Sequence, residues 1–294
     1  MAFRWRLLVA LVLVSLLALP LGSLAVADGL GDIAVFWGRN KSEGTLREAC
    51  DTGAYNTVLI SFGHGRYSLD LSGHPLAGVG DDVKHCQSKG ILVLLSIGPS
   101  AGAGADYSLP SPKSAADVAA YLWNAYLGGS YTGVRRPFGD AALDGVDFYI
   151  DQSFGAGAGD HYDELARRLY AYNSRRYRGR RLGVTLTASV RCAYPDTRLQ
   201  AALATGKFAR IHVRLYDSFN CTLFERENAE RWLSEYPSSR VFVGVSAEDK
   251  LGGQIDMKDV YYDMLQFIEK LPNYGGLVIW NRYYDKKNHF ISNS

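Results

Sequence analysis

The sequence lacks the residue patterns that usually hold metals, nucleotides or nucleic acids. It has neither the CxxC nor the HExxH spacing of zinc sites, so we expect no metal. No GxGxxG follows the first β-rich stretch, and we expect no cofactor. The formal net charge is only +2. It falls to about zero without the N-terminal Arg4 and Arg6, which excludes nucleic-acid binding by bulk charge.

Long apolar runs are also scarce, and the one that is present lies at the N-terminus. Residues 7–22 are apolar, follow a basic start and end near Pro20 and Gly22, with small residues from Ala25 to Ala27. This pattern predicts a secretory signal peptide, residues 1–27, followed by a mature chain of residues 28–294. No later stretch has the roughly 18 apolar residues of a membrane span. We therefore expect a soluble, extracellular protein without membrane contact.

Cysteine is rare, with four residues in the chain. In an oxidising compartment an even number predicts two disulfides, and the sequence alone leaves all three connectivities open. The cysteines are Cys50, Cys86, Cys192 and Cys221. The sequons at Asn40 and Asn220 are candidates for N-glycosylation, and the second is the weaker because Cys221 lies in its middle.

The rest of the chain alternates short β-rich stretches with helical patterns. The β-rich stretches are residues 32–38, 57–62, 91–98, 143–151, 182–189, 210–217, 240–247 and 275–282. Near-continuous apolar strands that alternate with helices predict a parallel sheet covered on both faces. Eight such units in one undivided α/β domain, residues 28–294, predict a (β/α)₈ TIM barrel, with a doubly wound sheet as the alternative. Ser114 and Asp160 are predicted helix caps.

Residues 143–152, LDGVDFYIDQ, carry acids on a strand. Because a strand alternates its faces, Asp147, Tyr149 and Asp151 share one side and Phe148 and Ile150 the other. Carboxylates on an apolar strand need water, a ligand or hydrogen-bond donors. A strand end with satisfied acids is the alternative to a functional site.

Other aromatic and polar residues also fall at predicted strand ends, where barrel enzymes carry their active sites. They are Phe36, Trp37, Phe62, Tyr216, Asp217, Trp280 and Asn281. Aromatic rings beside acids suit a sugar, so we expect these residues to converge on one carbohydrate cleft. The alternative for any single ring is that it fills the barrel interior.

The acidic strand resembles the DGxDxDxE signature of glycoside hydrolase family 18, the chitinase family. Asp144 and Asp147 match its first two acids, whereas Tyr149 and Asp151 stand where the third Asp and the catalytic Glu are expected. The chain is most similar to the plant class III chitinase branch and to the xylanase inhibitors that share its fold. Resembling stretches include residues 36–40, 72–90, 137–147, 187–196, 202–214 and 274–286.

The resemblance implies several features. It pairs Cys50 with Cys86 and Cys192 with Cys221, and it predicts cis peptides at Ser61–Phe62 and Trp280–Asn281. In this family Tyr216 matches the tyrosine that contacts the reacting N-acetyl group, and Trp280 matches the tryptophan of the cleft floor. The remaining cleft candidates are Phe36 and Phe62.

The two altered acids argue against hydrolysis. In this family the substrate's N-acetyl oxygen attacks the anomeric carbon while a Glu protonates the leaving oxygen. Asp151 is one methylene too short to place its carboxyl group there, and Tyr149 supplies no carboxylate and fills space that the sugar needs. We therefore expect no catalytic residues, only a remnant: Asp144, Asp147, Tyr149, Asp151 and Tyr216.

A basic loop, residues 173–182, offers a different function. It carries Arg175, Arg176, Arg178, Arg180 and Arg181. The resemblance implies that it enters the groove of family 11 microbial xylanases, where an arginine would meet the catalytic glutamates. The resemblance does not match that arginine to one position, and we choose Arg178, beside Gly179, first and Arg180 next. A further face for family 10 xylanases is implied but not placed. We expect a monomeric, glycosylated plant-defence protein of the cell wall. The alternatives are a solvated basic turn, a lectin for chitin-type oligosaccharides, or a weak chitinase.

Overall fold

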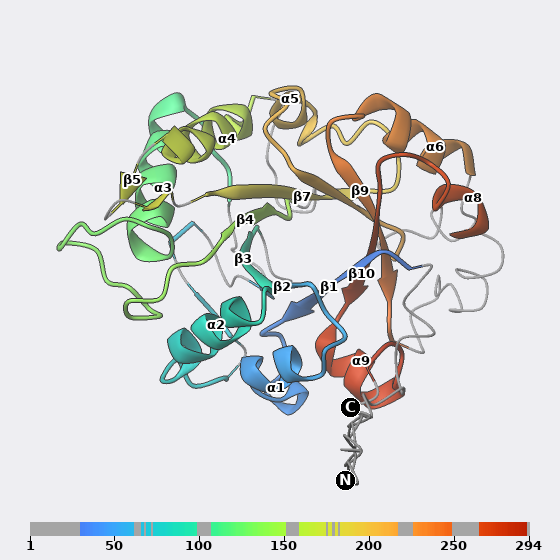
Figure 1. Cartoon of the computed structure of the whole chain (residues 1–294). Coiled ribbons are helices and arrows are strands. Elements are labelled where there is room, and N and C mark those ends of the chain that lie inside the picture. Colours follow the sequence, from blue (N-terminus) through green and yellow to red (C-terminus); the bar gives the residue numbers. More distant parts are fainter. Residues whose placement is uncertain are drawn as a thin grey trace, which may run out of the picture.

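A computed structural model shows how the chain after residue 29 is arranged (Figure 1). It describes residues 30–61, 66–67, 69–71, 73–98, 107–150, 159–174, 176–177, 180–181, 183–216, 226–248 and 265–292. The predicted signal peptide (residues 1–27), Asn220 and Cys221 lie outside these ranges. The same holds for Phe62, Asp151, Arg175, Arg178 and Asp217.

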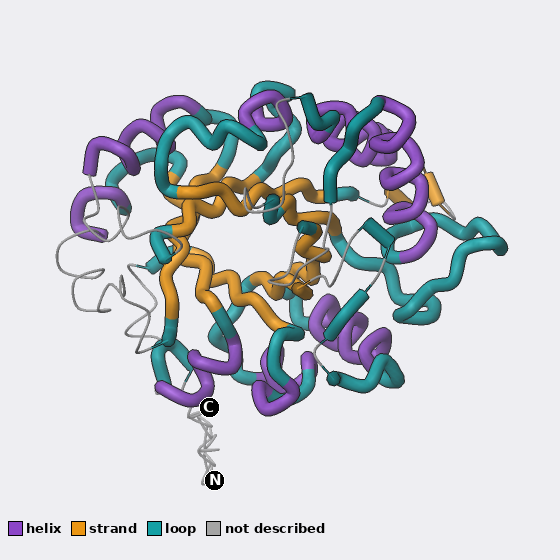
Figure 2. The backbone as a smooth tube through the Cα atoms, turned by 180° about the vertical axis from the view of Figure 1, so that it is seen from behind, coloured by secondary structure: helices purple, strands orange, loops and turns teal. Residues whose placement is uncertain are grey.

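Eight parallel strands close into a barrel, in the order β1-β10-β9-β8-β7-β4-β3-β2. They are β1 (Asp32–Trp37), β2 (Thr57–Ser61), β3 (Leu92–Ile97), β4 (Gly145–Phe148), β7 (Thr185–Arg191), β8 (Arg210–Arg214), β9 (Arg240–Ser246) and β10 (Tyr274–Trp280). Figure 2 shows the closed ring of strands. The predicted (β/α)₈ barrel is confirmed, and the doubly wound alternative is wrong because β1 pairs with both β2 and β10.

Helices surround the barrel (Figure 1). They are η1 (Lys41–Glu43), α1 (Leu46–Asp51), α2 (Val79–Ser88), α3 (Pro112–Ala125), α4 (Tyr162–Ala171), η3 (Tyr172–Ser174), α5 (Gln200–Leu203), α6 (Arg226–Glu235), α8 (Gln266–Ile268) and α9 (Arg282–Asn288). No helix in the described ranges is long and apolar enough to cross a membrane.

Strand alternation divides the core into an inner and an outer layer. On β1, Ala34 and Phe36 pack inside the barrel with residues such as Leu94. Ile33 and Val35 pack outside it, against the helices. Both sets are almost fully buried, as expected for a parallel sheet with both faces covered.

The two predicted helix caps are placed differently. Ser111 rather than Ser114 caps α3, because its hydroxyl accepts a hydrogen bond from the Ser114 backbone N–H at 3.1 Å. The helix begins at the next residue, Pro112, because proline is favoured at the first helical position. Asp160 lies before the α4 cap residue His161, and its carboxylate accepts instead from the Leu109 backbone N–H at 2.7 Å.

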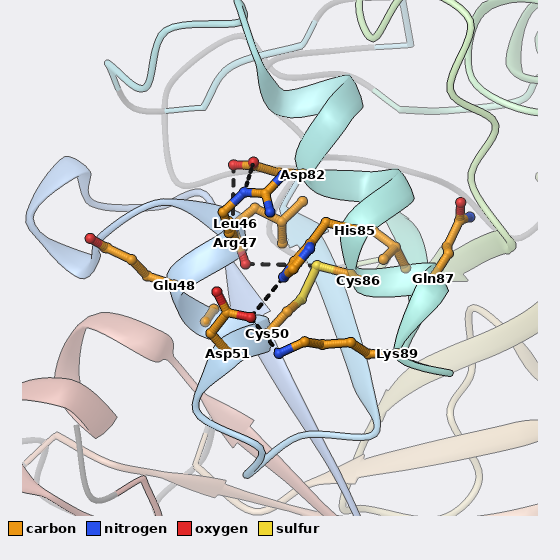
Figure 3. Close-up of a disulfide and its surroundings, with 12 residues drawn as sticks. Leu46, Arg47, Glu48, Cys50, Asp51, Asp82, His85, Cys86, Gln87 and Lys89 are labelled. Carbon is orange, nitrogen blue, oxygen red and sulfur yellow. Dashed lines mark hydrogen bonds and ion pairs between the residues drawn. A yellow bond between two sulfur atoms is a disulfide. The ribbon is translucent and has the colours of Figure 1, made fainter.

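A disulfide joins the first two α-helices (Figure 3). Cys50 on α1 is bonded to Cys86 on α2, as the resemblance implied. Beside it, the Asp51 carboxylate contacts both His85 on α2 and Lys89, the residue that follows α2. Cys192 is also disulfide-bonded, although its expected partner Cys221 lies outside the described residues.

The basic loop, residues 173–182, contains a small antiparallel hairpin. Its strands are β5 (Arg176–Tyr177) and β6 (Arg180–Arg181), in which Arg176 pairs with Arg181 and Tyr177 with Arg180. At its base, the Asn173 amide donates to the Val184 carbonyl at 3.1 Å and accepts from the Val184 backbone N–H. One side chain therefore ties the entry of the loop to its exit.

Candidate functional site

Aromatic rings meet at the carboxyl ends of the strands, where the cleft was expected. The Trp280 ring centroid lies 5.0 Å from Phe36, 5.8 Å from Tyr149 and 5.7 Å from Tyr216. Phe36 is buried, whereas the other three are half-buried at the mouth. The sequence therefore predicted correctly that these four rings share one site. The Trp280–Asn281 peptide is cis, as implied, while Ser61–Phe62 lies partly outside the described residues.

Trp37 and Asn281, two further cleft candidates, do not belong to this site. The Trp37 ring packs 4.5 Å from the ring of His74 in the outer layer, and its indole N–H donates to the Gly44 carbonyl at 3.0 Å. The Asn281 side chain caps α9. Because Phe36 and Trp280 already face the interior, their neighbours in sequence must face the other way.

Asp147 lies at the centre of a buried polar network inside the barrel. Its carboxylate accepts hydrogen bonds from the hydroxyls of Ser96 at 2.8 Å, Thr187 at 2.6 Å and Ser189 at 2.9 Å. His212 Nδ1 lies 3.3 Å from it, and both groups are fully buried. Burial alone would raise the pKa of Asp147, but His212 and the hydroxyls hold the pKa below its usual value.

Asp144 points away from this network. Its carboxylate accepts from the Val93 backbone N–H at 2.8 Å and from the Gln87 amide at 3.1 Å, on the side of α2. Burial raises the pKa of Asp144, which these two bonds only partly offset. Asp144 thus holds α2 against the strands and has no direct contact with the cleft rings.

The structure places an arginine where no site residue was predicted. Arg214 on β8 is fully buried, and its guanidinium carbon lies 4.0 Å from the centre of the Tyr149 ring. Its Nε donates to the Val190 carbonyl at 3.3 Å. The arginine and the tyrosine form a cation–π pair at the carboxyl ends of the strands. The signal in the sequence was the alternation of His212, Arg214 and Tyr216 along β8, which puts all three on the inner face.

The basic loop lies on the side of the molecule, apart from the cleft. It leads into β7 and so lies at the amino end of that strand, whereas the cleft lies at the carboxyl ends. Figure 1 shows β5 beside α3 at the edge of the molecule. The strands of the hairpin hold Arg176, Arg180 and Arg181, and the other two predicted arginines lie outside the described residues.

Known proteins identify the family of this barrel. Residues 32–250 match the model of glycosyl hydrolases family 18. The chain belongs to this family. No group of metal-binding side chains occurs among the residues that the structure describes. Family 18 membership agrees with the position of Asp147 on β4, of Asp144 directly before that strand, and of the ring cluster at the mouth.

Relatives in family 18 include both inhibitors and enzymes. Xylanase inhibitor protein 2 of Oryza sativa subsp. japonica is 60% identical over 272 residues, covering 90% of each chain. An acidic endochitinase of Vitis vinifera is 37% identical over 296 residues, covering 94% of this chain and 95% of that one. The crystal structure of the xylanase and α-amylase inhibitor XAIP-II from Scadoxus multiflorus has a TM-score of 0.79 and 31% identity, covering 89% of this chain and 97% of that one.

Proposed function

We propose that this family 18 protein is a catalytically inactive inhibitor of microbial endo-xylanases that acts in plant defence. The names of its relatives support the inhibitory activity. Its own cleft supports the loss of catalysis, because Tyr149 occupies the position expected for the third acid of the signature and packs against Arg214, Phe36 and Trp280. This packing of a tyrosine where the signature has an acid is the observation that carries the proposal.

Inhibition requires a surface outside the cleft, and the basic loop provides one. The backbone of the loop forms an antiparallel hairpin whose strands contain Arg176, Arg180 and Arg181, and Asn173 ties the ends of the loop. Arginine is permanently charged and donates in a planar fork, so it can pair with a catalytic glutamate of a family 11 groove. We propose that the loop enters this groove, with Arg178 as the main contact and Arg180 next.

An inhibition titration tests this proposal. Wild type and the single Arg→Ala variants at the five loop positions are titrated against fungal xylanases of families 11 and 10. Loss of a desolvated, paired arginine should cost about 2–5 kcal/mol in binding, whereas arginines at the rim should mainly slow association. Lys287→Ala, an exposed position on α9, is the matched control. If neither the single variants nor the one lacking all five arginines changes the inhibition constant, the loop is a solvated turn.

Sugar binding at the cleft distinguishes an inhibitor from a lectin for chitin-type oligosaccharides. Calorimetry with N-acetylglucosamine oligomers should show weak binding or none, because the Tyr149 ring stands where the signature has an acid and packs against the buried Arg214. Tight binding that is lost in Trp280→Ala would favour a lectin for chitin-type oligosaccharides.

Secretion and glycosylation are part of the same proposal. Asn40 caps η1 through its side-chain oxygen, which accepts from Ser42 N at 2.9 Å, so its amide nitrogen points elsewhere and can carry a sugar. Mass spectrometry of protein secreted by plant cells should find a mature N-terminus at Asp28 and a glycan on Asn40. An intact residue 1–27 segment would exclude signal cleavage.

A further inference from the structure

A second projecting loop lies beside the basic loop. It connects α3 to β4, spans residues 126–144, and extends from the edge of the molecule in Figure 1. Tyr131 on this loop is 67% exposed, more than any other large hydrophobic side chain that the structure describes as exposed. Tyrosine buries a large area on binding and loses little conformational entropy, which makes it a frequent anchor in protein interfaces.

The loop is held rigid by a single arginine. Arg136 Nη1 donates to the carbonyls of Asn124 and Gly129 at 2.6 and 3.0 Å. Its Nη2 donates to Leu127 and Ala141 at 2.9 and 2.8 Å. Its Nε donates to the Gly139 carbonyl at 2.9 Å. These five bonds join the two ends of the loop, so a partner would meet a surface that is already ordered.

The Tyr131 ring is itself oriented by its neighbours. The Tyr131 backbone N–H donates to the Asn124 side chain at 3.1 Å, and its carbonyl accepts from Val134 at 3.2 Å, which forms a tight turn. A Cβ atom on Gly133 would lie 2.8 Å from the Tyr131 ring. The ring therefore lies across Gly133, and a methyl group there would displace it.

The topology of the barrel places this loop next to the basic loop. The α3–β4 loop enters β4 and the basic loop enters β7, and these two strands pair directly. A cavity of about 520 Å³ lies between the bases of the two loops, lined by Leu127 and Gly128 on one side and Gly183 and Val184 on the other. Figures 1 and 2 both show the two loops on the same side of the barrel.

We propose that the α3–β4 loop is a second contact element for the xylanase that the basic loop engages, with Tyr131 as its aromatic anchor. This inference rests on the proposed function. The pairing of β4 with β7 brings the loop that carries Tyr131 and the basic loop to one side of the barrel. A partner with a carboxylate-lined groove would bury the ring at the border of that groove while the arginines enter it.

The test compares Tyr131 variants with hairpin variants in inhibition of a fungal family 11 xylanase. Tyr131→Ala should raise the inhibition constant about tenfold or more, as truncation of an anchor does. Tyr131→Phe should stay within about threefold of wild type, because the ring is retained. Gly133→Ala, which keeps the tyrosine but displaces its ring, should also weaken inhibition. Phe267→Ala, at a 46% exposed ring on α8, is the matched control and should have no effect. Thermal melting verifies that each variant is folded.

The outcomes separate this inference from the proposed function. In one outcome wild type inhibits, the hairpin variants inhibit less well, and Tyr131→Ala inhibits like wild type. The α3–β4 loop is then not a contact, and the proposed function stands. If Tyr131→Ala reduces only binding to insoluble polysaccharide, the ring is a carbohydrate contact and the inference is overturned. If wild type inhibits no xylanase of either family, the proposed function fails first.

Discussion

Asp144 and Asp147 stand three residues apart in one signature, yet folding shifts their pKa values in opposite directions. Hydroxyls and His212 hold the pKa of Asp147 below its usual value, so its ionised form stabilises the folded state. Burial raises the pKa of Asp144, so its ionised form opposes folding. The contribution of Asp147 is present above the unfolded-state pKa and is lost as pH falls through its folded pKa. That of Asp144 is present at low pH and is lost as pH rises.

Asp147→Asn should therefore destabilise the protein by about 3 kcal/mol at neutral pH, because it leaves a buried hydrogen-bonded network without its charge. The difference from wild type should shrink as the pH falls through the unfolded-state pKa of about 3.9, because the unfolded chain then binds a proton at Asp147 that the folded protein still excludes. Urea unfolding at pH 7 and pH 3 measures both values. Asp144→Asn is the control, and it should cost less at pH 7 than at pH 3. A difference for Asp147→Asn that does not change with pH would contradict this account.

Restoring the two altered acids should give at most weak chitinase activity. Tyr149→Asp removes the ring but places a carboxylate beside the buried Arg214 guanidinium. The new carboxylate would pair with this guanidinium and would not be free to contact the sugar. Release of fluorophore from chitin oligomers measures the double variant Tyr149→Asp, Asp151→Glu against wild type and Asp151→Glu alone. Robust hydrolysis by wild type would refute catalytic loss altogether.

At this scale the sequence predicted the ring cluster but not the arginine. Tyr149, Tyr216 and Trp280 could be placed because they match a signature or follow an apolar strand. Arg214 was missed because a charged residue in a strand is normally expected to face solvent. Its register with His212 and Tyr216 turns the side chain inward, where the Tyr149 ring and the Val190 carbonyl contact its guanidinium and offset part of the cost of burying its charge.

Among the elements, the basic loop depends on Asn173. This side chain satisfies both backbone groups of Val184, so the hairpin leaves and re-enters the barrel at one fixed point. Loop rigidity of this kind improves binding because less conformational entropy is lost when the partner docks.

Asn173→Ala should consequently weaken xylanase inhibition although Asn173 itself carries no charge. Removing the side chain leaves the two Val184 groups without this partner, at a cost of about 1–3 kcal/mol in stability. The inhibition constant and the unfolding free energy are measured on the same preparation, with Asn288→Ala, another half-buried asparagine bonded to a backbone carbonyl, as control. Equal inhibition by wild type and Asn173→Ala would show that the loop needs no such anchor.

Removal of the Cys50–Cys86 disulfide, which links α1 to α2, should destabilise the barrel. The bridge closes a segment with a sequence separation of 36, for which chain entropy alone gives roughly 3–4 kcal/mol. The exposed ion pairs beside it should not compensate, since such pairs contribute little. Thermal melting of the double Cys→Ala variant measures the loss. Non-reducing peptide mapping of wild type also tests whether Cys192 is bonded to Cys221.

Element boundaries were predicted less well than element types. All eight strands follow from apolar stretches, since a parallel sheet buried on both faces leaves a strong signal. Ser114 and Asp160 were misplaced as caps because any Ser or Asp near a helix start gives the same local signal. The choice depends on which backbone N–H lies within reach, and for Asp160 that donor is Leu109, 51 residues away in sequence.

For the whole molecule, the two ends of the barrel are separate surfaces. The rings of the cleft lie at the carboxyl ends of the strands, and the basic loop and the α3–β4 loop lie at the amino ends of β7 and β4. Changes at one end should leave the other unaffected, since distant sites contribute independently.

Tyr149→Ala should thus inhibit xylanase like wild type, within about twofold, even though it opens the mouth of the barrel. Chitin oligomers at saturating concentration should likewise fail to relieve inhibition, whereas xylan oligomers should compete. Steady-state inhibition assays with each oligosaccharide make the comparison. Relief by chitin oligomers would place the inhibitory surface at the cleft instead.

In barrel enzymes the carboxyl ends of the strands carry the chemistry and the amino ends serve stability. Here Tyr149 and Arg214 pack against each other at that mouth, and the basic loop and the α3–β4 loop lie at the opposite end of the barrel. Those loops are held at their bases by Asn173 and Arg136, so their tips can change without disturbing the strands. Substitutions at these tips should therefore change what the loops bind while leaving the stability of the barrel nearly unchanged.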